Sequence, residues 1–169
     1  MKRIQFQGMI FVIGLICVLY IPRVSVAQEK FLFDLKHIAD EPRQEVEKIL
    51  GKPSALADDL FRNSRGTSYA AIRATYLNGA VEVTYLEGGA RYLRIWLQKL
   101  DEKYRRYAYP KDGWTLIGDL GLDREAPADL SNQSMTRWRD FPGVYEITVF
   151  PTAERRIWYA HILTSRIYQ

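Results

Sequence analysis

Alternation of apolar and polar residues constrains the fold of this 169-residue chain more than any other feature. Val81, Val83 and Tyr85, for example, alternate with polar side chains, so a strand here would have one apolar face. Asn78-Gly79 precedes this run and suits a two-residue turn, since both residues tolerate positive φ. We predict antiparallel strands over six such segments: 70–77, 80–86, 91–98, 135–141, 144–150 and 156–163.

A helix is predicted before the first strands. Pro42 suits the first helical position, after Asp40 or Glu41 as N-cap, and Gly51 suits the end of the helix. The intervening apolar residues recur at helical spacing, and shorter helical segments are expected elsewhere. We therefore predict an α+β domain in which an antiparallel sheet of about six strands, as two three-stranded meanders, carries two or three short helices packed on one face.

The two halves of the predicted domain resemble each other. When 113–163 is placed on 31–98 with a shift of 64 residues, several residues coincide in the strand regions. Both a tandem duplication of a helix-plus-meander unit and common strand patterning explain this match, and both interpretations stay open. The coinciding pairs are Gly79 with Gly143, Glu82 with Glu146, Thr84 with Thr148 and Arg91 with Arg155.

The N-terminus has the three parts of a secretory signal. Lys2 and Arg3 precede an apolar run over 9–21, and small residues stand before a predicted cleavage site between Ala27 and Gln28. The alternative is a permanent anchor, but the run is shorter than the roughly 20 apolar residues that cross a bilayer. We predict that 1–27 is a signal peptide and that 28–169 forms a single domain, exported by the general secretory route to the periplasm or medium without a stable membrane anchor.

Removing the signal changes the composition of the chain. Three of the 24 basic side chains, Lys2, Arg3 and Arg23, lie in 1–27, so 28–169 retains 21 basic side chains against 20 acidic ones. Near neutrality disfavours nucleic acid as a partner. The one cysteine, Cys17, lies in the apolar run, and the mature chain would therefore have no disulfide.

No catalytic, cofactor-binding or metal-binding set is apparent in the sequence. The two histidines, His37 and His161, have no neighbouring residues at metal-ligand spacing. A glycosidase-like pair of carboxylates, such as Glu82 and Glu146 brought together by the sheet, stays open as an alternative. We expect no cofactor and no enzymatic activity.

The first half resembles a small exported module. The segment 44–54, which ends in Leu-Gly-Lys-Pro-Ser, precedes Tyr76, Gly79, 81–83 and Tyr85. This pattern is similar to the β-lactamase inhibitor protein and to small outer-membrane assembly lipoproteins. The resemblance implies tandem helix-plus-sheet repeats and binding to other envelope proteins. It transfers no functional residue, because this chain lacks the acylated cysteine of the lipoproteins and the disulfides of the inhibitor.

Aromatic and arginine side chains suggest a surface for a protein partner. Tyr92, Arg94 and Trp96 alternate on one predicted strand, and Trp138 is expected nearby. Tyr, Trp and Arg often anchor protein interfaces, although each of these aromatics also suits the core. We predict an exported non-enzymatic domain that binds an envelope or extracellular protein. The alternatives are a carboxylate-dependent hydrolase and a carrier of an apolar ligand.

Overall fold

The computed structural model describes residues 32–169. The predicted signal peptide and the cleavage site between Ala27 and Gln28 lie outside these residues. Between residues 32 and 169, none of the helices combines the length and the apolar character needed to cross a membrane.

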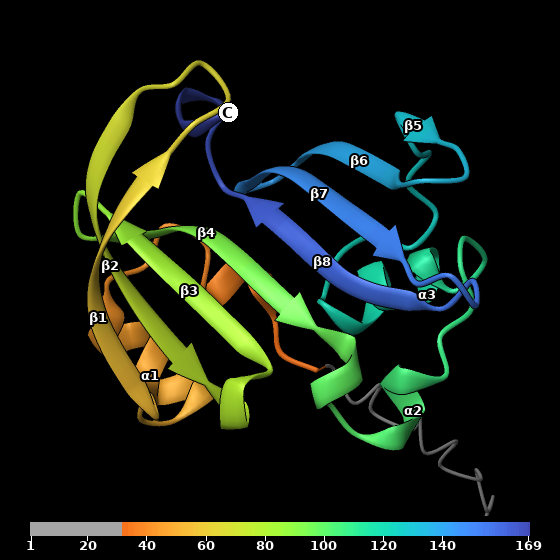
Figure 1. Cartoon of the computed structure of the whole chain (residues 1–169), viewed down its shortest axis with the longest axis horizontal. Coiled ribbons are helices and arrows are strands. Elements are labelled where there is room, and N and C mark those ends of the chain that lie inside the picture. The colour runs from red at the N-terminus through yellow and green to blue at the C-terminus, as the bar shows by residue number, and fades with distance from the viewer. Residues whose placement is uncertain (1–31) are drawn as a thin grey trace, which may run out of the picture.

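The described chain folds around one antiparallel sheet of eight strands in the order β1-β2-β3-β4-β8-β7-β6-β5. Figure 1 shows these strands side by side, from β1 at one end to β5 at the other. The strands are β1 (Ala55–Arg62), β2 (Ser68–Tyr76), β3 (Val81–Leu86), β4 (Gly89–Trp96), β5 (Leu130–Ser131), β6 (Thr136–Phe141), β7 (Val144–Pro151) and β8 (Ile157–Leu163).

The predicted fold of about six strands in two meanders with helices packed on one face is therefore wrong. The sheet gains β1 and β5 at its edges, and β4 pairs with β8 so that both halves share a single sheet. The sequence pattern missed β1 because this edge strand is mostly exposed on both faces, which removes the apolar alternation. It missed β5 because two residues are too few for a pattern.

The helices of the described chain are short. They are α1 (Arg43–Leu50), α2 (Glu102–Arg105) and α3 (Gly113–Asp119), with 3₁₀ turns η1 (Leu35–His37), η2 (Leu77–Gly79), η3 (Leu97–Lys99) and η4 (Arg166–Tyr168). Pro42 is the N-cap of α1 and not its first residue, and Gly51 ends the helix at a φ of 79°. Asp40 is not a cap, because its carboxylate instead pairs with Arg91 at 2.5 Å.

The hairpin between β2 and β3 is wider than the two-residue turn that Asn78-Gly79 predicts. Tyr76 pairs with Val81, so residues 77–80 form the connection. Leu77 as well as Asn78 and Gly79 has positive φ, at 48°, 54° and 86°. The prediction was wrong because the turn extends the left-handed conformation to a leucine that does not favour it.

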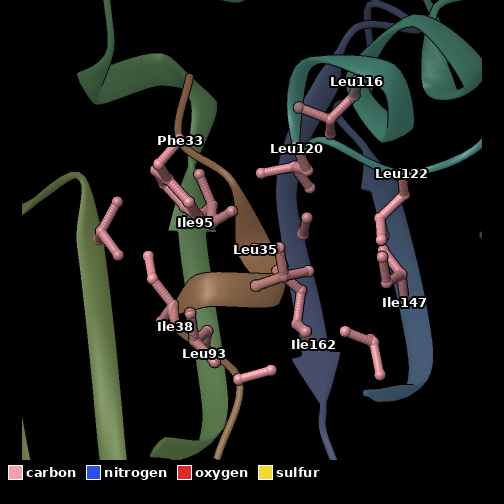
Figure 2. Packing of buried hydrophobic residues seen from close by; sticks show 14 of the residues in the cluster. Phe33, Leu35, Ile38, Leu93, Ile95, Leu116, Leu120, Leu122, Ile147 and Ile162 are labelled. Atoms are coloured by element: carbon pink, nitrogen blue, oxygen red, sulfur yellow. The ribbon is translucent and has the colours of Figure 1, made fainter. Parts of the chain in front are cut away.

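The core lies where the two halves of the sheet meet. Figure 2 shows η1 crossing β4 and β8, with Leu35 and Ile38 beside strand residues such as Leu93 and Ile162. All four of these side chains are fully buried. Because successive side chains of a strand point to opposite faces, the residues between these core positions lie on the other face of the sheet.

Gly89 marks a close approach between β4 and the segment before α1. A Cβ added at Gly89 would lie 2.8 Å from the backbone oxygen of Asp40, which cannot move freely because the Asp40 and Ala90 backbones are hydrogen-bonded. We expect Gly89→Ala to lower the free energy of unfolding by about 1–3 kcal/mol, as overpacking does. Urea unfolding followed by circular dichroism measures this loss.

Gly118→Ala is the matched control for this change. The nearest atoms to a Cβ at Gly118 belong to the guanidinium end of the Arg124 side chain and not to the backbone, and alanine favours the helix in which Gly118 lies. The control should cost less than Gly89→Ala. Equal losses in the two variants would contradict the close approach at Gly89.

Candidate binding face

The sheet face that points away from the core residues Leu93, Ile95 and Ile162 carries a cluster of aromatic side chains around one arginine. The cluster has nine residues, of which seven belong to strands β4, β7 and β8. All nine are half-buried except Trp158, which is exposed. We call this surface the open face. It comprises Phe61, Glu82, Tyr92, Arg94, Trp96, Phe150, Trp158, Tyr159 and His161.

Strand register brings these residues together from distant parts of the sequence. Arg94 pairs with Glu82 on β3 and with His161 on β8, and Trp96 pairs with Tyr159. Directly paired residues of antiparallel strands project to the same face. The central part of the open face is thus set by backbone pairing between β3, β4 and β8.

A bulge in β8 adds another aromatic ring to the open face. Phe150 pairs with Tyr159 and Pro151 with Ile157, so Trp158 is the extra residue on β8. A bulge of this kind bends the strand and redirects side chains. The Trp158 ring consequently contacts the rings of Trp96 and Tyr159, with centroids 5.8 and 4.9 Å away.

Arg94 is held at the centre of the open face by several partners. Its guanidinium carbon lies 5.4 Å from the Trp96 ring centroid and 5.8 Å from that of Tyr92. Arg94 Nη1 lies 3.6 Å from a Glu82 carboxylate oxygen, and Arg94 Nε donates to His161 Nε2 at 3.0 Å. Such contacts fix the Arg94 side chain in one orientation before binding. The side chain therefore loses less conformational entropy when a partner binds.

The environment of His161 favours its neutral form. Burial, followed by the positive charge of Arg94, lowers the pKa of His161 to about 4. His161 Nε2 accepts the Arg94 hydrogen bond, which places the remaining ring proton on Nδ1. Burial also raises the pKa of Tyr92, against the effect of Arg94. The open face thus has a neutral imidazole and a neutral phenol beside the fixed charge of Arg94.

A cavity of about 450 Å³ lies at the β1 side of the open face. The β1–β2 hairpin and the C-terminal turn η4 form its far wall, and Figure 1 shows the C-terminus beside the end of that hairpin. Phe61 lies 5.5 Å from Tyr92 and 6.5 Å from Tyr168 between ring centroids, which connects this wall to the central strands. Residues with charged side chains also line the cavity, among them Asp59, Arg73, Glu82 and Arg94.

Three of the four predicted partner-surface residues come together. Tyr92, Arg94 and Trp96 lie on the open face, whereas Trp138 is fully buried and contacts Trp114 with a centroid distance of 5.2 Å. The prediction for Trp138 is wrong because its position in β6 points to α3, in register with the core residue Ile147.

Sequence reasoning missed the contribution of β7 and β8 to this surface. Phe150, Trp158, Tyr159 and His161 all lie within two strands that the pattern identified, but the pairing of β4 with β8 was not apparent. The dense aromatic run 158–161 was the available signal. It could not be assigned to a face without knowledge of the bulge.

The two glutamates proposed for a hydrolase do not face each other. Glu82 is on β3 and Glu146 is on β7, and strands β4 and β8 lie between them. Three inter-strand spacings place the two strands about 14 Å apart. The carboxyl groups of a glycosidase lie closer, about 5–9.5 Å apart. Each carboxylate instead has an arginine partner, Arg94 for Glu82 and Arg139 for Glu146.

Histidine and carboxylate groups do not cluster into a metal-binding arrangement anywhere in residues 32–169. No protein-family model, curated protein or solved structure matches the chain. The resemblance to the β-lactamase inhibitor protein and the assembly lipoproteins therefore stays a prediction.

Proposed function

We propose that this protein is an exported, non-enzymatic binding protein and that its open face contacts another protein of the cell envelope or medium. The observation that carries the proposal is the cluster of half-buried aromatic rings around Arg94 on a sheet face. Interfaces are enriched in Trp, Tyr and Arg, and their strongest contacts are held rigidly before binding.

The exposed part of the cluster points to a protein surface as the ligand. Trp158 is 44% exposed although its ring makes edge-to-face contacts with Trp96 and Tyr159, so a partner would remove the remaining apolar area of the ring from water. The cavity beside Tyr92 would accept a protruding side chain of the same partner. Its charged lining suits a polar or charged residue.

The two alternative functions have less support. A carboxylate-dependent hydrolase needs two facing acids, and Glu82 and Glu146 are separated by two strands. A carrier of an apolar ligand needs a predominantly apolar pocket, whereas the cavity beside Tyr92 has Arg73 and Asp59 in its wall.

Affinity capture with two matched variants tests the proposal. The tagged full chain is expressed in its own host, and proteins that co-purify are compared for wild type, Trp158→Ala and Ile49→Ala. The two positions are similarly exposed, at 44% and 41%, but Ile49 lies on α1 and outside the open face. We expect Trp158→Ala to weaken capture of a reproducible partner by about tenfold or more, as loss of an aromatic anchor does.

Ile49→Ala should leave that capture unchanged. Circular dichroism spectra of both variants should match the wild type, which separates loss of contact from loss of fold. Capture that survives Trp158→Ala, or that is lost equally in Ile49→Ala, would contradict the open face as the contact surface.

A further inference from the structure

The two edges of the sheet differ in how they are protected from pairing with another chain. Strand β5 has only two residues, and short edge strands are a common protection. Strand β1 has eight residues and pairs with β2 over its whole length without a register shift. A long and regular edge strand presents unpaired backbone groups that can form hydrogen bonds with another strand.

Two of the usual protections of an edge strand, proline and lysine, are missing from β1. The segment 55–62 contains no proline and no lysine, and it carries the exposed residues Leu56 and Leu60, with exposed fractions of 49% and 65%. Ile72 on β2, which is 43% exposed, pairs with Asp58 and is therefore a diagonal neighbour of both leucines. The edge thus has an apolar strip on the sheet face opposite the open face.

The backbone N–H of Leu60, in the middle of β1, bonds to a side chain of its own strand. The N–H of Leu60 donates to the carboxylate of Asp59 at 2.9 Å, which is a local bond to the preceding side chain. A donor used in this way is not shared with the neighbouring strand. A strand added outside β1 would displace the Asp59 carboxylate and replace this local bond with one to its own carbonyl group.

The charges of β1 select one occupant and one register. We propose that β1 pairs in antiparallel fashion with β1 of a second copy of this chain, with the two-fold axis at Leu60. This register places each Leu60 opposite the other and each Asp58 opposite Arg62 of the partner subunit, and both charged side chains are exposed in the single chain. Opposite charges across strands stabilise pairing, and like charges destabilise it.

The neighbouring registers lack this complementarity. A two-fold axis at Asp58 or at Asp59 places two like carboxylates directly opposite each other, and an axis at Ala57 opposes no charges of opposite sign. The register at Leu60 also joins the two apolar strips, since both Leu60 side chains lie on the same face. A two-fold axis perpendicular to the sheet leaves the two open faces on one side, so the dimer presents two copies of that surface.

A cysteine scan tests the register directly. The full chain carries Cys17→Ser so that the introduced cysteine is the only one. Opposed Leu60→Cys residues would have Cα atoms about 5.5 Å apart, which a disulfide spans. Leu56→Cys residues would be roughly 27 Å apart in this register. We expect mild oxidation to link most of the Leu60→Cys chains into covalent dimers and to leave Leu56→Cys uncross-linked.

Charge reversal provides an independent test in the cysteine-free chain. Sedimentation equilibrium should give a dimer. Asp58→Arg or Arg62→Asp alone should raise the dissociation constant of this dimer by about tenfold, because each change creates two like-charged pairs. The double variant should recover the wild-type value. A chain that remains monomeric, or reversals that do not rescue each other, would overturn the proposal, as would faster cross-linking at position 56 than at position 60.

Discussion

Replacing Trp138 with alanine is expected to lower the free energy of unfolding by about 3–5 kcal/mol, the usual cost of deleting a buried aromatic side chain. Trp138 is fully buried. Its ring joins the sheet to α3, where it contacts Trp114, and a Cβ added at Gly113 would lie 2.8 Å from Trp138 Cη2. Because the packing is this tight, the surrounding structure can collapse only slightly into the cavity that Trp138→Ala would leave. Guanidinium unfolding followed by circular dichroism measures the loss.

Trp158→Ala is the matched control, because it deletes the same side chain from an exposed position. Trp158 is 44% exposed, so its loss should cost about 1 kcal/mol or less. The two tryptophans therefore have opposite roles: Trp138 should be needed for the fold, and Trp158 for binding. Losses of stability that agree within 1 kcal/mol would contradict the placement of Trp138 in the core.

The second large effect is a loss of stability at mildly acidic pH that depends on His161. A histidine in an unfolded chain has a pKa near 6.5, whereas burial and Arg94 lower the pKa of His161 to about 4 in the fold. Between these values the unfolded chain binds a proton that the folded chain does not. Stability therefore falls as the pH decreases through this range, by about 2 kcal/mol at pH 5 relative to pH 7.5.

His161→Gln isolates this contribution from other titrating groups. Glutamine does not titrate, and its side-chain oxygen can still accept the hydrogen bond from Arg94 Nε. Urea unfolding of both proteins at pH 7.5 and pH 5 should show a smaller loss in the variant, by about 2 kcal/mol. The same pH dependence in both proteins would show that His161 is not buried beside Arg94.

The sequence pattern identified the interior strands because they have one buried and one half-exposed face. In β3 the core positions Val81 and Val83 alternate with Glu82, and this contrast is what periodicity detects. Strand β1 lacks the contrast because it lies at the edge, and β5 is too short for any periodicity. The order of the strands was also beyond reach, because the pairing of β4 with β8 joins residues 92–96 to 159–163 and depends on the whole fold.

The candidate site was only partly predictable for the same reason. Tyr92, Arg94 and Trp96 share one strand, so alternation alone places them on one face. Trp138 belongs to another strand, and its face was not determined by residue type, since tryptophan suits both a core and an interface. His161 and Trp158 could be assigned to the open face only from the register of β8 and its bulge.

The central claim is that the open face binds another protein, and cross-linking from one position on that face tests it most directly. A photoreactive phenylalanine analogue replaces Trp158 in the full chain, and in a second sample it replaces Ile49 on α1, which has a similar exposed fraction. Both chains are irradiated in their host, and the products are identified by mass spectrometry. We predict a defined adduct with one partner protein from position 158 and none from position 49. Adducts with the same protein from both positions, or none from position 158, would contradict the claim.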